Sequence, residues 1–357
     1  MYDPLTIRSI YGAYNVKFDN FETQLKTDLR DGDVVLVDSN VSSLYPLIDE
    51  LIASSNKIIV QPSERAKEYG QLADVIESIV ETGFSRNNRL IAIGGGVTQD
   101  ITGFISSILF RGVPWRFYPT NLLSQCDSCI GSKTSINFRE YKNQLGNFYP
   151  PEQIVIDFRF LETLPKKDVF SGLGEMLHYF LVDGQESLKQ IGSEIQTAIE
   201  DYSTLPTLVV KSLKIKQKMV ELDEFDRGPR NVFNYGHSFG HALESVTDYA
   251  VPHGIAVAFG MDLANVISAR NGLIPMSLRN DMRQIIAPVW SETSLSVFDV
   301  DNYLLALSKD KKNVGKQTKV ILTKGPGLMF KSTLAHSAEV IDLIDSYFRL
   351  RQYEKNL

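Results

Sequence analysis

Three short, strongly apolar segments near the start of the chain restrict its possible folds more than any other feature. They are DVVLVDSN (33–40), KIIVQPS (57–63) and RLIAIGGG (89–96), each rich in Val and Ile and each ending in turn residues. Amphipathic helical patterns, NVSSLYPLIDELIASS and ERAKEYGQLADVIESIVETGF, separate them. Strands that are apolar throughout and alternate with helices are typical of a parallel sheet with helices on both faces.

Two more strands are expected at WRFYP (115–119) and QIVID (153–157), which extends this pattern to about residue 160. We therefore predict an α/β, Rossmann-like doubly wound domain over residues 1–162. The segments that follow have helical periodicity and few strand signals, for example KKDVFSGLGEMLHYFLV and SAEVIDLIDSYFRLRQYEKN. Residues 163–357 are predicted to form a second, mostly α-helical domain, and a chain of 357 residues fits two domains.

Composition excludes several classes of protein. The apolar fraction of 43% and the charged fraction of 22% are those of an ordinary globular protein, and the net charge of −6 argues against coating nucleic acid. The sequence contains no uncharged apolar run of about 18 residues, so no membrane span is expected. The first residues, MYDPLTIRSIYGAYNV, lack the basic and apolar regions of a secretory signal. We expect a cytoplasmic protein.

The two cysteines, Cys126 and Cys129, form a C-x-x-C in QCDSCIG. A four-cysteine zinc site is excluded because the sequence has no second pair. A thioredoxin-like redox pair is one alternative. We favour the other, in which both are reduced and pack as small hydrophobic side chains.

The segment IAIGGGVTQD combines a strand, three consecutive glycines and a helix start that ends in Asp100. Glycines at such a turn let backbone N–H groups approach a pyrophosphate. The order G-x-G-x-x-G is not met, so a tight turn without a ligand is an equal alternative. Asp38, at the end of an earlier strand, favours the nucleotide because a carboxylate there can hold a ribose diol.

The segment GSKTSINFREYKNQLGNFYPP looks like a loop and contains Lys133, Lys142 and Asn143. It is either a solvated surface loop or an anion site, in which ammonium and amide groups converge on a phosphate.

Histidines are few but grouped: four of the five lie in predicted helical segments of the second domain. Glu175 and His178 are spaced i, i+3, His237 and His241 are spaced i, i+4, and His253 lies near a helix start. One carboxylate with two or three imidazoles suits a zinc site that keeps an open position. For any single histidine, a hydrogen-bonded place in the core or at the surface is the alternative.

Taken together, these segments resemble the sugar phosphate cyclases, and among them most closely the dehydroquinate synthases. The resemblance extends from about Asp38 to Gly327. It is densest in GGGVTQDITGF, RGVPWRFYPTNLLSQCDSCIGSKTSINF, KIKQKMVELDEFDRGPRNVFNYGHSFGHALE, PHGIAVAFGM and KDKKNVGK. It implies an enzyme that uses NAD and a divalent metal, Zn²⁺ or else Co²⁺. The implied reaction closes 3-deoxy-arabino-heptulosonate 7-phosphate into 3-dehydroquinate with loss of phosphate, a step of the shikimate pathway to the aromatic amino acids.

The resemblance also implies a role for individual residues. The metal ligands would be Glu175, His237 and His253, with His241 beside the substrate phosphate instead. The other phosphate contacts would be Lys133, Asn143, Asn234, one lysine of Lys311 and Lys312, and Arg111 from the second subunit of a homodimer.

Lys216 and Arg230 match the pair that holds the substrate carboxylate in the family, and Asp127 and Lys142 match residues near the reacting hydroxyls and the nicotinamide. The implied NAD positions are Asp38, Glu64, Lys67, Gly95, Gly96, Asp100, Thr120, Asn121, Lys133 and Lys142.

Two residues depart from the family pattern. His178 replaces a lysine that contacts a substrate hydroxyl, and an imidazole is not cationic throughout the neutral range. Ile255 replaces the glutamate of the usual HGE, a carboxylate that would orient His253. Smaller departures are Gln99 and Asn121, where glycine and threonine are usual.

Three alternatives to a dehydroquinate synthase remain. The first is a specialised cyclase that uses another heptose phosphate, as KNQLGNFYPP suggests for a valiolone-type product. The second is a metal-dependent polyol dehydrogenase related to glycerol dehydrogenase, which the cluster of Lys133, Asn143, Lys216 and Arg230 disfavours. The third is a degenerate cyclase that has lost turnover.

Overall fold

The computed structural model describes residues 2–139, 141–293, 295, 299–308 and 317–353. The chain divides into two compact units, one formed by residues 1–164 with 209–225 and the other by 165–208 with 226–357. Helix α8 (Leu205–Leu222) therefore begins in the second unit and continues into the first. The predicted domains, 1–162 and 163–357, stay a prediction.

The first unit is built on a seven-stranded sheet with the order β1-β2-β9-β6-β5-β3-β4. Its strands are β1 (Leu5–Ile7), β2 (Tyr14–Phe18), β3 (Val34–Asp38), β4 (Asn56–Val60), β5 (Leu90–Gly94), β6 (Trp115–Pro119) and β9 (Gln153–Ile156). All neighbours pair in parallel except β1 and β2, so the five predicted strands and their parallel pairing are confirmed. The hairpin of β1 and β2 was not expected.

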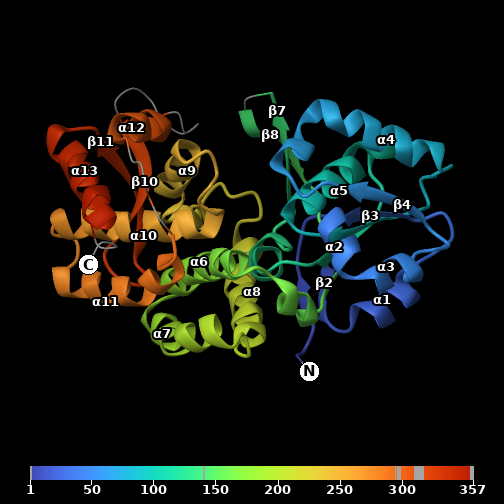
Figure 1. Ribbon diagram of the computed structural model, residues 1–357, viewed down its shortest axis with the longest axis horizontal. Helices are drawn as coiled ribbons and strands as arrows, with labels where there is room; N and C mark the ends of the chain where they lie inside the picture. The colour runs from blue at the N-terminus through green and yellow to red at the C-terminus, as the bar shows by residue number, and fades with distance from the viewer. Residues whose placement is uncertain (1, 140, 294, 296–298, 309–316, 354–357) are drawn as a thin grey trace. The chain divides into compact units, whose positions relative to one another are not determined.

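Helices cover both faces of this sheet (Figure 1). On one face, α1 (Phe21–Asp28), α2 (Ser39–Leu44) and α3 (Pro46–Leu51) pack on alternate strand residues such as Val35, Ile91 and Val155. On the other lie α4 (Leu72–Glu81) and α5 (Gly96–Ile108). Pro46 divides the first predicted helix into two, because proline fits the first turn of a helix and not its interior.

The segment predicted to be a loop is instead an antiparallel hairpin of β7 (Lys133–Phe138) and β8 (Tyr141–Phe148). The Thr134 side chain reinforces it, since the backbone N–H of Asn147 donates to the Thr134 hydroxyl and that hydroxyl donates to the backbone carbonyl of Asn147. The loop prediction was wrong because β8 is mostly exposed and polar, without the alternation that marks a half-buried strand.

The second unit is organised around α10 (His253–Arg270), which is buried on all sides along most of its length. Helices α6 (Lys166–Asp183), α9 (His237–Val246) and α11 (Met276–Ile286) pack directly against it. Figure 1 shows α10 running between α9 and α11. The remaining helices of the described residues are α7 (Gln185–Glu200), α12 (Val300–Ser308) and α13 (Ala338–Tyr353).

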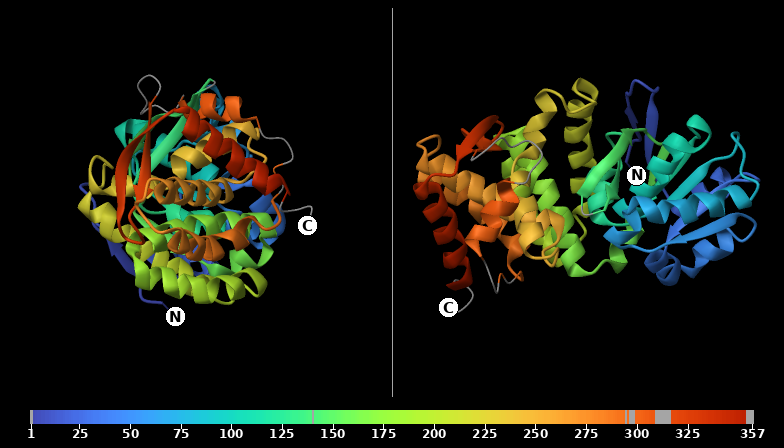
Figure 2. Two further views of the ribbon diagram at one scale, coloured as in Figure 1. Left: turned by 90° about the vertical axis from the view of Figure 1, so that its left-hand side faces the viewer. Right: turned by 90° about the horizontal axis from the view of Figure 1, so that it is seen from above.

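A two-stranded ribbon, β10 (Gln317–Thr323) and β11 (Met329–Ala335), also belongs to the second unit. Figure 2 shows it in orange-red beside α10, against which β10 packs. This ribbon was not predicted. Among the described residues, the helices are too short or too polar for any of them to cross a membrane.

Candidate active site

Close contacts between glycines bring α6, α9 and α10 together at one place. A Cβ on Gly174 of α6 would lie 2.1 Å from the carbonyl oxygen of Gly254, and a Cβ on Gly260 of α10 would lie 2.0 Å from that of Gly236. Only glycine allows backbones to approach so closely, and Gly236 is also left-handed, with φ +82°.

Each of these contacts adjoins a predicted metal ligand in the sequence. Glu175 follows Gly174, His253 precedes Gly254, and His237 follows Gly236. The helix contacts therefore bring these three side chains to one point.

The three side chains converge on a common space, with one ligand atom from each within 4.8 Å of the others. The two carboxylate oxygens of Glu175 face different imidazoles: Oε1 lies 3.6 Å from Nε2 of His237, and Oε2 lies 3.7 Å from Nε2 of His253. Glu175 is only 2% exposed, whereas the two histidines are partly open. A buried carboxylate with two partly exposed imidazoles matches the donor set of zinc.

Hydrogen bonding selects the tautomer of both histidines that can bind a metal through Nε2. Nδ1 of His237 lies 3.3 Å from the carbonyl of Tyr235, which can only accept, so Nδ1 carries the proton. Nδ1 of His253 lies 3.1 Å from the carboxylate of Glu244, which also accepts, so this Nδ1 carries a proton too. Burial, followed by the nearby His178, His253 and His241, lowers the pKa of His237 well below its usual value. The imidazole is therefore neutral, which is the form that binds a metal.

His178 and His241 flank this group without belonging to the three. His178 is fully buried, with Nδ1 3.7 Å from Oε1 of Glu175 and its ring against Tyr179 and Phe233. The exposed His241 stacks on His253 at 5.7 Å and meets the edge of His237 at 5.6 Å. The arrangement thus separates the i, i+4 pair of the sequence, since His237 faces Glu175 while His241 lies at the open side.

Glu244 is a further residue of this site, and it is not among the residues predicted from the sequence. It lies on the same face of α9 as His237 and His241, seven and three residues further along. That spacing was a usable signal, but its target on α10 became visible only in the fold.

Two more predicted residues of the second unit lie directly before α9, in the 3₁₀ turn η6 (Pro229–Asn234). Arg230 is buried, and the side-chain amide of Asn234 donates to the Asn231 carbonyl at 3.0 Å. Phe233 packs on His178 and Tyr179, which fastens this turn to α6 beside the three ligand residues. Lys311 and Lys312 lie outside the described residues.

In the first unit, the predicted NAD residues gather at the carboxyl ends of β3 and β5. The chain leaves β3 for β4 on one side and later returns to β5 on the other, so these two strands form the point where the strand order reverses. Asp38 ends β3, and its Cβ lies 3.0 Å from the position of a Cβ on Gly94 at the end of β5. Open α/β sheets bind ligands at such points.

The start of α5 leaves room for a ligand. Gly95 is its N-cap without a side-chain hydrogen bond, and a Cβ on Gly96 would meet no atom within 4 Å. A Cβ on Gly95 would lie 2.4 Å from Nδ2 of Asn121, and Thr120 is buried beside them. The exposed N–H groups and dipole of a helix start favour an anion such as a pyrophosphate.

Asp38 is engaged in the backbone as well. Its Oδ1 accepts from the N–H groups of Asn40 at 2.8 Å and Val41 at 3.4 Å, so it caps α2. Burial raises the pKa of Asp38, and these two hydrogen bonds act in the opposite direction.

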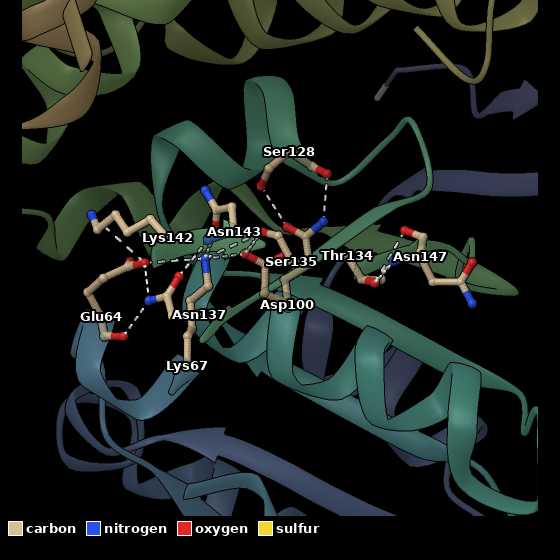
Figure 3. A network of polar contacts seen from close by, with 11 residues as sticks. Glu64, Lys67, Asp100, Ser128, Thr134, Ser135, Asn137, Lys142, Asn143 and Asn147 are labelled. Carbon is tan, nitrogen blue, oxygen red and sulfur yellow. Dashed lines mark hydrogen bonds and ion pairs between the residues drawn. The ribbon is translucent and has the colours of Figure 1, made fainter. Parts of the chain in front are cut away.

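A polar network joins the hairpin of β7 and β8 to α5 and to η1 (Glu64–Lys67) (Figure 3). Nζ of Lys67 lies 2.8 Å from Oδ2 of Asp100 and donates to Oδ1 of Asn143 at 3.0 Å. Asp100 also accepts from both the N–H and the hydroxyl of Ser135. Lys142 lies 3.8 Å from Glu64.

Charge within the network is balanced. Burial lowers the pKa of Lys67, but Asp100 and Glu64 outweigh it and leave that pKa raised. Burial raises the pKa of Asp100 against the opposing effect of Lys67. The structure thus brings Asn143, predicted for the phosphate, together with Lys67 and Asp100, predicted for NAD. Lys133 and Arg111 are elsewhere in this unit: Lys133 begins β7 and is exposed, and Arg111 follows α5 with φ 66°.

Asp127 lies in a π-helical turn (Ser124–Ser128) and is paired with Lys216 of α8. The ammonium donates to the Asp127 carbonyl at 2.8 Å and to its carboxylate. Gln99 holds the same turn to α5, because its amide donates to the Ser128 carbonyl and accepts from the Ser128 hydroxyl, both at 2.6 Å. Gln99, which stands where the family usually has glycine, therefore positions the segment that contains Asp127.

Both cysteines of this turn region are buried. Burial raises the pKa of Cys129 to about 12, so its thiol stays protonated at neutral pH. This favours the packing interpretation, because a redox pair requires an accessible thiolate.

Comparison with known proteins identifies the family. Residues 57–171 match the model of the 3-dehydroquinate synthase N-terminal domain, and residues 172–313 match that of the C-terminal domain. The chain is 36% identical to the 3-dehydroquinate synthase of Alkaliphilus metalliredigens over 299 residues, which cover 82% of this chain and 84% of that one. These relatives favour the dehydroquinate synthase prediction over the valiolone-type alternative.

Solved structures show the same fold. A 2-deoxy-scyllo-inosose synthase complexed with carbaglucose-6-phosphate, NAD⁺ and Co²⁺ superposes with a TM-score of 0.84 at 22% identity, covering 98% of this chain and all of that one (100%). The 2-epi-5-epi-valiolone synthase of Streptomyces hygroscopicus, with NAD⁺ and Zn²⁺ bound, gives 0.79 at 24% identity, covering 94% and 97%. Glycerol dehydrogenase of Schizosaccharomyces pombe is less similar, at 0.60 and 15% identity over 96% and 91%. The predicted fold class is confirmed, and the chain belongs to the 3-dehydroquinate synthase family.

Proposed function

We propose that this chain is an NAD- and zinc-dependent cyclase, a carbon–oxygen lyase that converts 3-deoxy-arabino-heptulosonate 7-phosphate to 3-dehydroquinate with elimination of phosphate. The observation that carries the proposal is the convergence of Glu175, His237 and His253 within 4.8 Å, in a chain of the dehydroquinate synthase family. The tautomers of both histidines and the low pKa of His237 suit a metal.

Zinc held by these three residues would polarise a substrate hydroxyl, and NAD at the β3 and β5 ends would accept and return a hydride, so that no net oxidation results. Cobalt would serve in place of zinc, as the structure of the inosose synthase with Co²⁺ suggests. For NAD we propose Asp38, the glycine turn with Gly95 and Gly96, and the network of Lys67 and Asp100. Thr120, Asn121, Glu64, Lys133 and Lys142 complete this set.

The remaining residues would bind and orient the substrate. Lys216 and Arg230 would hold its carboxylate, and His241, Asn234, Asn143 and Lys133 its phosphate, with a lysine at 311 or 312. The half-buried carboxylate of Asp127 beside Lys216 can accept a proton from a hydroxyl, and His178 can donate to one. Oriented charges of this kind lower each barrier mainly by positioning.

We further propose a cytoplasmic homodimer in which Arg111 reaches the phosphate of the other subunit. Phe110 and Arg111 are successive residues with positive φ, which supports a defined backbone conformation for this surface segment. Sedimentation equilibrium tests the dimer, and an Arg111→Ala variant that raises the KM without dissociating it would agree with the role of the side chain.

The function is tested by mixing the purified protein with zinc, catalytic NAD and the heptulosonate phosphate, then following phosphate and carbocycle formation. We expect both products in equal amount and no accumulation of NADH. Phosphate release from sedoheptulose 7-phosphate alone would instead indicate a specialised cyclase. Steady NADH formation with a simple polyol would indicate a dehydrogenase, and no turnover of any heptose phosphate a degenerate cyclase.

A further inference from the structure

Glu244 contacts one of the three proposed metal ligands from outside the metal site. It extends from α9, and its Oε2 lies 3.1 Å from Nδ1 of His253, on the side of the imidazole opposite Nε2. Nε2 in turn faces Glu175. The side chains are 13% exposed for Glu244 and 31% exposed for His253, so this hydrogen bond is partly shielded from water.

The contact matters because residue 255 cannot make it. Ile255 lies two residues after His253, and its side chain has no atom that can form a hydrogen bond. Ile255 is 2% exposed and lines a separate hollow with Phe170 and Val251. The carboxylate that contacts Nδ1 of His253 is that of Glu244, which reaches it from another helix.

We propose that Glu244 is the positioning residue of the metal site: by accepting the Nδ1 proton of His253, it fixes the ring with the Nε2 lone pair directed at the metal. This inference rests on the proposed function, since it takes His253 as a ligand. In this role Glu244 orients a ligand and is not itself one. A carboxylate in this position also increases the basicity of the imidazole, and loss of such a partner typically weakens metal binding about 10–100-fold.

The geometry also defines the variants. Glu244→Gln has the same shape and can still accept the proton, but it lacks the charge, so a smaller loss is expected than for Glu244→Ala. Asp248→Asn is the matched control, because it removes one carboxylate from the exposed segment just after α9. Asp248 has φ 48°, a conformation that asparagine tolerates.

The experiment measures zinc affinity of the metal-free protein by competition with a chromophoric chelator, with Co²⁺ absorption as a second readout of ligand geometry. We expect Glu244→Ala to bind zinc about 10–100-fold more weakly, Glu244→Gln to lie between it and the wild type, and Asp248→Asn to match the wild type. The Co²⁺ bands should shift in Glu244→Ala. Thermal unfolding of the metal-free variants should be unchanged, which separates positioning from a merely structural role.

Several outcomes would overturn the inference, and they differ from failure of the proposed function. If both Glu244 variants bind zinc with wild-type affinity and His237→Ala still loses zinc, the positioning role of Glu244 is refuted and the metal site stands. The wild type could also bind a second zinc ion that is lost on mutation of Glu244 while the first stays tightly bound. Glu244 would then be a ligand together with His241 and His253, whose ligand atoms also lie within 4.8 Å of one another. That result would refute the positioning role. Unchanged zinc binding by His237→Ala would instead refute the proposed metal site.

Discussion

The glycine contact between α6 and α10 yields a prediction with opposite signs for two similar mutations. Gly174→Ala places a methyl group in the interior of α6, 2.1 Å from the carbonyl oxygen of Gly254. Gly192→Ala places the same group in the interior of α7, where the nearest atom is the end of the Ile285 side chain at 3.0 Å. Both helices belong to the second unit.

The magnitudes follow from the two surroundings. Replacing glycine by alanine inside a helix stabilises it by roughly 0.5–1 kcal/mol. At Gly174 the obstruction is backbone, which cannot rotate away, so α6 and α10 must separate by an amount on the order of 1 Å. Overpacking of this kind costs up to about 3 kcal/mol, which leaves a net destabilisation of about 2 kcal/mol. At Gly192 the Ile285 side chain can adjust, so the helix gain of up to about 1 kcal/mol remains.

Metal binding should respond more strongly than stability. Glu175 follows Gly174 directly, and zinc tolerates ligand distances within only about 0.2 Å of the ideal. We expect Gly174→Ala to lose most of its zinc affinity and Gly192→Ala to retain it.

The assay combines thermal unfolding of the metal-free proteins with a zinc titration. For a unit of this size, about 2 kcal/mol corresponds to a fall in Tm of about 4–8 °C for Gly174→Ala, whereas Gly192→Ala should melt at or above the wild-type temperature. A Gly174→Ala protein with wild-type Tm and zinc affinity would refute the argument that the close helix contact sets the ligand geometry.

Three further predictions concern the first unit. Lys67→Met should raise the Kd for NAD about tenfold, because it leaves Asp100 without its ammonium partner. The control Lys57→Met loses only a surface pair with Asp49 and should leave the Kd unchanged. Equal Kd values for the two variants in calorimetry would contradict this. Gln99→Ala should destabilise the unit by about 1–3 kcal/mol in urea and lower kcat, since both hydrogen bonds to the Asp127 turn are lost; an unchanged kcat would speak against positioning. With its pKa raised to about 12, Cys129 should have almost no thiolate at pH 8. A thiol reagent should therefore label it only after unfolding. Rapid labelling of the native protein would disprove its burial.

The elements that could be predicted are those whose pattern is local. β3 and β5 are buried at every position and apolar up to their last residues, Asp38 and Gly94, because both faces of the sheet are covered. Such strands are recognisable without any partner. The hairpin of β7 and β8 has no such pattern. It depends on contacts to remote residues, such as Ser135 with Asp100 and Asn137 with Glu64, which a single sequence does not reveal.

The site divides in the same way. The spacing of His237 and His241 indicated a common helical face, but the i, i+4 pair does not act as one unit in the structure, because only His237 faces Glu175. Glu244 shares that face, yet its partner His253 is brought to it by the packing of α9 on α10. Helical periodicity predicts which residues share a face and cannot predict what that face meets.

Helix α8 has a consequence for how the chain is made. Its residues 209–222 belong to the first unit, although more than forty residues of the second unit precede them in the sequence. Glu224, just beyond its end, accepts hydrogen bonds from Ser9, from the Ile10 backbone and from Ser132, so the N-terminal segment depends on it. On the ribosome, the first unit therefore cannot complete its core until residue 225 has emerged. A fragment that ends at residue 164 should be poorly folded, and a nick in the loop before α8 should leave both pieces associated.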